Sequence, residues 1–300
     1  MLRRAFWALA MTLCLIVPAA LQAQMGDYLD VYIAHVKPEK AADFEALAKK
    51  VVDANRHNNG DNWMALETVY GEGDTYVFIS TRQNYADIDK GSDAFFGALN
   101  KAYGKDGAQK ILHEWDTCLS GSRSEFRKRR VDLSRKVPDA ASYAKFIGES
   151  RVLRTTAVHI RPGHIAEFED LLKETKTAGE RNPNTQPVLV SQVIEGGRGT
   201  IFYVSTLRTS LGGFDKNPTM REILGEEGYK KYLQISADTV ANTDSAIYRF
   251  SAELSNPPQE VIAAAPDFWN PKPIMAAKKK PKTTGMEPAA QKTKESPKTN

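Results

Sequence analysis

The chain repeats one pattern along its length. His35-Val36-Lys37-Pro38 matches His159-Ile160-Arg161-Pro162 at an offset of 124 residues, and Gly104-Lys105-Asp106-Gly107 matches Gly225-Glu226-Glu227-Gly228 at an offset of 121. A register that shifts by only a few residues over this distance indicates a tandem duplication of one folding unit. We therefore expect two similar units in one chain. The duplication indicates an architecture and leaves the ligand and the chemistry open.

The two ends of the chain differ in composition from the part between them. Arg3 and Arg4 precede an apolar run that ends at Leu21-Gln22-Ala23, which predicts a signal peptide over residues 1–23 and a periplasmic or secreted protein. An uncleaved membrane anchor is the alternative. Residues 272–300 carry lysines and prolines and no aromatic residue, which predicts a disordered tail. Without these ends the net charge changes from +4 to −4, so the basic pI belongs to the ends.

The basic tail also bears on partners. Lysines at positions 278, 279, 280 and 282 can contact anionic envelope surfaces weakly by charge attraction, and a solvated tail without a partner is the alternative. The body between the ends has no basic excess, so we expect no specific binding of nucleic acid. The expected partner is a small molecule.

Each unit shows the same order of elements. In the first, residues 28–36 are rich in β-branched and aromatic residues and precede Pro38, which predicts a strand followed by the start of a helix. Gly71-Glu72-Gly73-Asp74 then separates two further strand-like segments and predicts a hairpin. A second helix and a last strand complete a βαββαβ unit, which is the ferredoxin-like arrangement. We expect an α+β protein with ferredoxin-like repeats at 27–137 and 151–256, joined by a connector.

A single sheet of this kind leaves one face uncovered, and two copies can cover both faces by packing sheet against sheet. At an offset of 125, Val77 and Ile79 match apolar residues, which suits the face under the helices. The alternate positions are mixed aromatic and polar, as the interior of a barrel with a cavity requires. These positions are Tyr76, Phe78 and Ser80 in the first copy and Ile201, Tyr203 and Ser205 in the second.

The residues resemble a known superfamily. A strand that ends in Val-Lys-Pro or Ile-Arg-Pro-Gly, followed by a helix with Glu and Phe early in it and then a hairpin, is similar to the dimeric α/β barrel superfamily, which includes antibiotic-biosynthesis-monooxygenase-like and NIPSNAP-like proteins. The resemblance implies an eight-stranded barrel, here formed as an internal pseudo-dimer, so that a monomer suffices. It also implies a barrel cavity used for cofactor-free oxygenation, haem binding or binding of small ligands.

His35 and His159 are the first candidates for a functional role, because they are equivalent in the two repeats, lie near strand ends and carry the side chain best suited to acid–base chemistry. A structural role at the strand ends is the alternative. Glu67 and Gln192 are also equivalent, at an offset of 125, but the charge is present in only one copy. We therefore predict a ligand-binding set that consists of His35, Glu67, Tyr76, Phe78, His159, Gln192, Tyr203 and Ser205.

The sequence lacks several signatures of specialised sites. It has no paired-cysteine metal motif, no His pair spaced for zinc, no Gly-x-Ser-x-Gly and no phosphate-binding loop. No acid, base and orienting group stand together in either repeat. We therefore predict an exported small-molecule-binding protein. The alternative is a cofactor-free monooxygenase-like or haem-binding enzyme that uses the barrel cavity.

Overall fold

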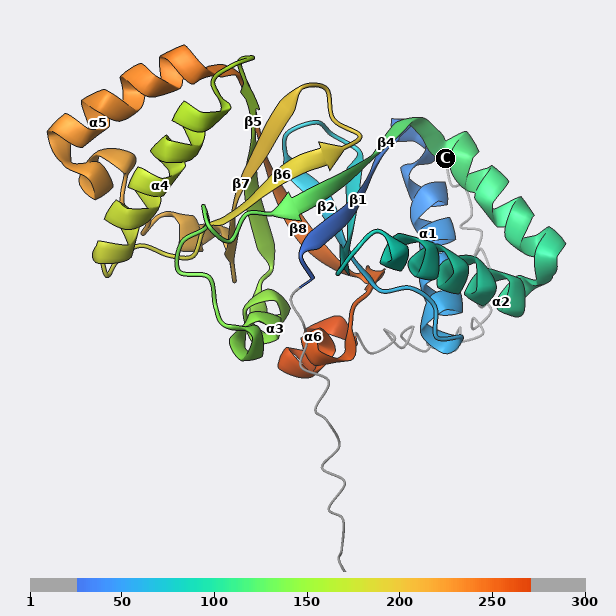
Figure 1. Ribbon diagram of the computed structural model, residues 1–300. Helices are drawn as coiled ribbons and strands as arrows, with labels where there is room; N and C mark the ends of the chain where they lie inside the picture. Colours follow the sequence, from blue (N-terminus) through green and yellow to red (C-terminus); the bar gives the residue numbers. More distant parts are fainter. Residues whose placement is uncertain (1–25, 271–300) are drawn as a thin grey trace, which may run out of the picture.

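A computed structural model describes residues 26–270 (Figure 1). The expected signal peptide over 1–23 and the expected tail over 272–300 lie outside these residues, so both remain predictions. The first half of the molecule consists of β1 (Tyr28–Val36), η1 (Pro38–Lys40), α1 (Ala41–His57), β2 (Trp63–Tyr70), β3 (Thr75–Arg82), α2 (Ala86–Cys118) and β4 (Leu119–Arg129). The second half consists of β5 (Val152–Ile160), α4 (Ile165–Arg181), β6 (Leu189–Glu195), β7 (Thr200–Arg208), η2 (Leu211–Phe214), α5 (Met220–Thr239) and β8 (Val240–Asn256).

Both halves are βαββαβ units, and their eight strands form one closed antiparallel barrel. The strand order is β1-β3-β2-β8-β5-β7-β6-β4, and β4 returns to β1. The halves meet at two seams, where β2 pairs with β8 and β4 pairs with β6. Closure gives every strand edge a partner, which an isolated half would lack. The α+β fold with an intrachain pseudo-dimeric barrel is therefore confirmed.

The helices cover the outer faces of the barrel, α1 and α2 on one half and α4 and α5 on the other (Figure 1). The apolar stripe of α1 is buried as expected, with Phe44 fully buried among Leu47, Val51 and Val52. In the second half, Phe168 and Leu171 of α4 pack on Phe202 of β7. Each half therefore has its own core between the helices and the sheet.

The long helices α2 and α5 each contain one interruption. Gly104 has φ 70° and ψ 167°, and Gly225 has φ 71° and ψ 174°, which are not helical values. Residues with side chains rarely adopt this backbone conformation. The repeated Gly-x-x-Gly motif therefore marks the same bend in both halves.

Three short helices close one end of the barrel and were not predicted. The segment expected as a connector forms α3 (Ala140–Glu149), and α6 (Gln259–Ala264) and α7 (Pro266–Trp269) follow the last strand. In Figure 1, α3 and α6 lie together under one end of the barrel. Trp269 is fully buried against Phe250, and its indole N–H donates to the Gly148 carbonyl at 2.9 Å. No helix within residues 26–270 is long and apolar enough to cross a membrane.

Candidate functional site

The barrel encloses a cavity of about 600 Å³. Strand alternation sends every second side chain into it, so each strand contributes a short row of residues. Most of the walls are apolar, and a few hydroxyl, imidazole and guanidinium groups interrupt them. The apolar lining includes Leu29, Ile33, Val77, Ile79, Leu153, Leu189, Ile201, Leu207 and Phe250.

Four of the eight predicted site residues line this cavity, namely His35, His159, Tyr203 and Ser205. Ser205 shares a hydrogen bond of 2.8 Å with Thr155 across β5 and β7. The repeat-equivalent histidines are therefore placed on the inner face in both halves. Their role in binding a ligand remains a prediction.

The expected orientation of Tyr76 and Phe78 is wrong, because both face the helices. In the sheet His35 lies opposite Thr75, whereas His159 lies opposite Ile201. The true offset in β3 and β7 is thus 126 residues, one more than the sequence match suggested. A slip of one residue moves every side chain to the other face of a strand. Val77 and Ile79, expected under the helices, consequently line the barrel cavity.

Outside the barrel, Tyr76 and Phe78 take part in packing between the sheet and α1. The Tyr76 hydroxyl donates to Glu45 Oε1 at 2.9 Å, and both aromatic rings contact Phe44. Burial and the neighbouring carboxylate raise the pKa of Tyr76 far above its ordinary value. Neither residue can touch a molecule inside the barrel.

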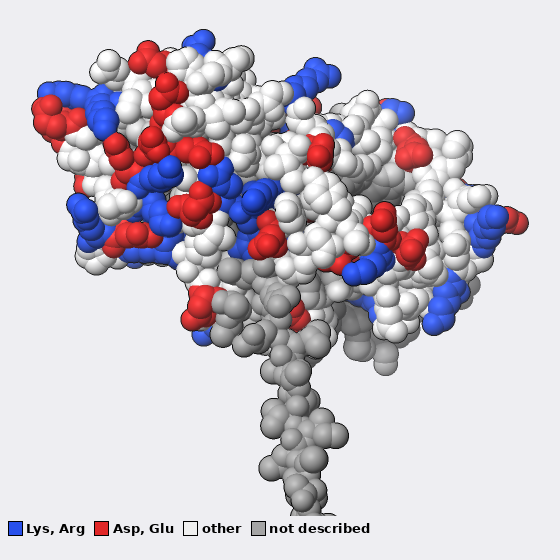
Figure 2. Space-filling model, viewed as in Figure 1, with Lys and Arg blue, Asp and Glu red and all other residues white. Residues whose placement is uncertain are grey.

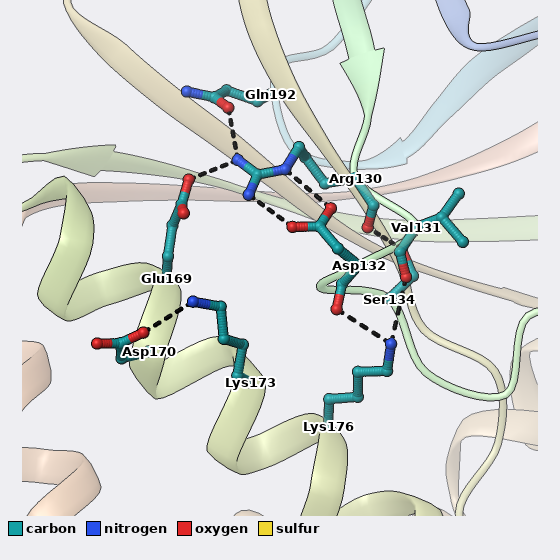
Figure 3. A network of polar contacts seen from close by, with 9 residues as sticks. All are labelled: Arg130, Val131, Asp132, Ser134, Glu169, Asp170, Lys173, Lys176 and Gln192. Atoms are coloured by element: carbon teal, nitrogen blue, oxygen red, sulfur yellow. Dashed lines mark hydrogen bonds and ion pairs between the residues drawn. The ribbon is translucent and has the colours of Figure 1, made fainter.

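Glu67 and Gln192 are equivalent, as the sequence match proposed, but they also lie outside the barrel. Glu67 lies opposite Tyr76 and alternates with Leu66, which points inward. Gln192 accepts a hydrogen bond of 2.8 Å from Arg130 Nη1, and the same guanidinium contacts Glu169 and Asp132 (Figure 3). The prediction that these two residues face a ligand in the barrel is therefore wrong. Gln192 belongs to a polar network between β4, α4 and β6.

The main polar group in the cavity is a cluster on β4 that sequence reasoning missed. Glu125 is buried, and its carboxylate accepts from Arg127 Nε at 2.8 Å and lies 3.2 Å from Arg123 Nε. Tyr203 donates to the same carboxylate at 3.2 Å, and the Arg127 guanidinium lies 3.5 Å from the centroid of its ring. One carboxylate thus holds two arginines, which leaves this wall with excess positive charge. The sequence signal for this cluster is the charged residue at every second position of 123–129, which places all these charges on one face of the strand.

The equivalent wall of the second half carries no such cluster. At the offset of 121, the inward positions of Arg123, Glu125 and Arg127 become Asp244, Ala246 and Tyr248 on β8. Burial raises the pKa of the Tyr203 and Tyr248 hydroxyls, so both remain protonated donors at neutral pH. The cavity therefore has one cationic wall and one mainly aromatic and apolar wall.

The two histidines stand at the end of the barrel that carries the β2–β3 hairpin. His35 Nδ1 lies 3.1 Å from Thr75 Oγ1 and 3.4 Å from Glu72 Oε1. His159 Nε2 lies 3.3 Å from Asp244 Oδ2. Both carboxylates are largely exposed, so each pair bridges the cavity and the solvent at its mouth. The opposite end is closed by Tyr143 and Ile147 of α3.

No family model and no curated protein matches the sequence. Among solved structures, an anthrone oxidase-like protein matches with a TM-score of 0.50 and 13% identity, over 76% of this chain and 93% of that chain. A protein of Lactobacillus acidophilus NCFM, provisionally described as a monooxygenase, matches with a TM-score of 0.43 and 11% identity, over 74% and 93%. A chlorite dismutase from Candidatus Nitrospira defluvii matches with a TM-score of 0.41 and 10% identity, over 77% and 93%.

At such low identities the comparison concerns the fold. The first of these structures aligns over most of both chains, and the strand order of this molecule is a closed barrel made of two ferredoxin-like halves. The chain therefore has the fold of the dimeric α/β barrel superfamily, with both halves of the barrel in one polypeptide.

Proposed function

We propose that this protein binds a small, mostly apolar molecule with a polar or anionic group inside its barrel. The observation that carries the proposal is the enclosed cavity with one cationic wall, formed by Arg123 and Arg127, which the buried Glu125 carboxylate holds in place. Apolar pockets with a few convergent polar groups are the usual form of small-molecule sites. The apolar walls would hold the body of the ligand, and the N–H groups of the β4 arginines would hold its polar end.

The site supports binding better than catalysis. The Glu125 carboxylate already receives two arginines and a tyrosine hydroxyl, so no lone pair is directed at the cavity as a base. The histidines pair with exposed carboxylates at the mouth and do not converge with the β4 cluster on one point. A binding protein needs neither a free base in the cavity nor catalytic groups that converge on one point.

Filling the mouth of the cavity tests the proposal. Ala246 lines the cavity beside the β2–β3 hairpin, and Ala246→Trp should block entry. Ile247→Trp, on the same strand but outside the cavity lining, is the matched control. Nile red fluorescence should report binding to the wild type and the control and at least tenfold weaker binding to Ala246→Trp, with similar melting temperatures. Equal binding by all three proteins would place the ligand elsewhere.

The alternative, a haem-binding or monooxygenase-like function, has less support. Glu72 and Asp244 lie beside His35 Nδ1 and His159 Nε2, so only the other nitrogen of each ring could ligate iron, and both rings stand at the mouth of the cavity. Within residues 26–270, no group of three or more His, Cys, Asp or Glu side chains is arranged to hold a metal ion. Haemin titration separates the two functions. We expect no Soret shift; a shift that His35→Phe or His159→Phe abolishes would favour haem.

We also propose that the protein is exported to the periplasm or beyond the cell. The support is the sequence of residues 1–23, with two arginines, an apolar run and a cleavage-like end. Cell fractionation and N-terminal sequencing test it. The mature chain should begin at Gln24, and an intact N-terminus in the cytoplasmic fraction would contradict export.

A further inference from the structure

Each half of the molecule has a second cavity, between its helices and the outer face of its sheet. The first-half cavity has a volume of about 480 Å³ and lies under α1 and α2. The second-half cavity has a volume of about 790 Å³ and lies under α4 and α5. Because the halves are equivalent, the differences between these cavities show what changed after the duplication.

In the first half, two carboxylates neutralise the one arginine at the end of the cavity. Arg82, the last residue of β3, donates to Asp30 Oδ2 at 3.1 Å and to Asp61 Oδ1 and Oδ2 at 2.8 and 2.6 Å. Gly91 of α2 gives the guanidinium the room it needs, because a Cβ there would lie 2.7 Å from Arg82 Nη2. The arginine is therefore fully occupied within the protein.

The second half keeps the arginine and loses both carboxylates. Arg208 occupies the position of Arg82, because Val152 pairs with Arg208 as Tyr28 pairs with Arg82. On the adjacent strand, Arg154 stands where the first half has Asp30, at an offset of 124. Asp61 lies six residues before Glu67, and Gln186 lies six residues before the equivalent Gln192. Gln186 therefore takes the place of Asp61 in the second half.

The second-half cavity is consequently lined by basic residues without acidic ones. Arg135, Arg154, Lys176 and Arg208 line it, and its lining contains no Asp or Glu. Within residues 26–270, no salt bridge joins Arg135, Arg154 or Arg208 to a carboxylate. Arg208 instead donates to the Gly213 carbonyl at 3.3 Å and to Asn217 Oδ1 at 2.8 Å. Burial, together with Arg154 and Arg135, lowers the pKa of Arg208.

A second observation also indicates an absent partner. Thr206 lines the same cavity, and its Oγ1 atom is buried without a hydrogen-bond partner among the described residues. Buried hydroxyl groups are bonded in the large majority of cases, so an unbonded one requires an explanation. An oxygen-bearing ligand that accepts from Thr206 and from the arginines would supply the missing bond and offset the like-charge repulsion.

We propose that the cavity beneath α4 and α5 is a second binding site, which holds the carboxylate or phosphate group of an amphipathic small molecule. The anionic group would lie among Arg135, Arg154 and Arg208, with Thr206 as a further donor. The apolar body would lie against Val158, Phe168, Leu171, Ile223, Tyr232 and Val240, which line the same cavity. This site is on the opposite face of the sheet from the barrel cavity, so it does not depend on the function proposed above.

Calorimetric titration of the full-length protein with decanoate, decyl phosphate and decanol tests the proposal. We expect both anions to bind roughly tenfold or more tightly than decanol, because charge-assisted hydrogen bonds hold only the anions. A preference for one anion would identify the head group. Decanol binding as tight as decanoate would overturn the proposal.

The matched variant is Arg154→Asp, which recreates the Asp30–Arg82 pair of the first half. It should keep the fold and weaken decanoate binding roughly tenfold or more, while Arg161→Gln, an exposed residue outside the cavity, should leave binding unchanged. Ala246→Trp, which fills the mouth of the barrel, should remove any decanoate bound inside the barrel and leave unchanged the binding that depends on Arg154. If Arg154→Asp does not fold, Arg154→Gln and Thr206→Val provide the test. Unchanged affinity in folded Arg154 and Thr206 variants would overturn the site.

Discussion

Arg127 and Arg130 are three residues apart and serve different parts of the molecule. Arg127 points into the barrel and bonds to Glu125, whereas Arg130 points outward to Asp132 and Glu169 (Figure 3). Strand alternation alone produces this division, since neighbouring residues face opposite sides of a sheet. The basic run 127–130 therefore contributes to two separate ion-pair networks, one inside the barrel and one outside it.

The Arg130 network gives a prediction at the scale of one residue. Arg130→Gln should lower the free energy of unfolding by about 1–3 kcal/mol at neutral pH, because Glu169 and Gln192 lose a charged donor. Urea denaturation checks it. Lys128→Gln, an exposed substitution near the end of β4 and two residues before Arg130, is the control and should change the free energy by less than about 0.5 kcal/mol.

The same network predicts a pH dependence. The Arg130 guanidinium holds the pKa of Asp132 below its ordinary value, so this carboxylate stabilises the fold above the unfolded pKa, near 4, and less as the pH falls through the lower folded pKa. The difference between wild type and Arg130→Gln should therefore narrow in acid. Asp132 is half exposed, so solvent screening keeps its contribution to the free energy of unfolding under about 1 kcal/mol. A difference that grows in acid would contradict the assignment.

At the scale of elements, periodicity and repetition predicted every strand of the barrel, because these segments alternate or carry turn residues in both copies. They did not predict the inner face of β3. The offset is 124 residues at His35, 125 at Glu67 and 126 at Thr75, so the segment before β2 absorbs one residue and the β2–β3 hairpin absorbs the other. Sequence matching placed the shift one residue wrongly. Tyr76 and Phe78 were therefore assigned to the wrong face.

The interrupted helices give a prediction about local conformation. Gly104→Ala and Gly225→Ala should each lower the free energy of unfolding by about 1–3 kcal/mol, because a Cβ disfavours their backbone angles even though nothing lies within 4 Å. Thermal denaturation measures the change.

Gly97, earlier in α2, is the matched control for these two variants. It is exposed, has no atom within 4 Å of a built Cβ and does not have a positive φ. Gly97→Ala should therefore stabilise the protein by about 0.5–1 kcal/mol. If all three substitutions stabilise the protein, Gly104 and Gly225 do not have the positive φ angles that disfavour a side chain.

At the scale of the whole molecule, composition predicts the distribution of surface charge, whereas the helices that close one end of the barrel are not evident from the repeat. Acidic and basic side chains are interspersed over the visible face that includes α4 and α5 (Figure 2), as expected for a body without a basic excess. One end of the barrel is closed by α3, α6 and α7, which follow the last strands of the two βαββαβ units and lie outside the units themselves. Because α6 and α7 are only a turn or two long, periodicity does not reveal them, and their packing around Trp269 is a tertiary contact.

The two seams predict how the molecule unfolds. Separated halves would expose the edges of β2 and β4 in one fragment and of β6 and β8 in the other, together with the apolar inner faces that now line the cavity. Unpaired edges beside an apolar face promote association, so residues 26–137 and 151–270 expressed alone should aggregate or self-dimerise. Light scattering after size-exclusion chromatography checks this.

The intact chain should unfold in one transition, with the far-ultraviolet circular dichroism and tryptophan fluorescence signals changing together. Two stable monomeric fragments, or two separate transitions, would show that the barrel does not couple its halves.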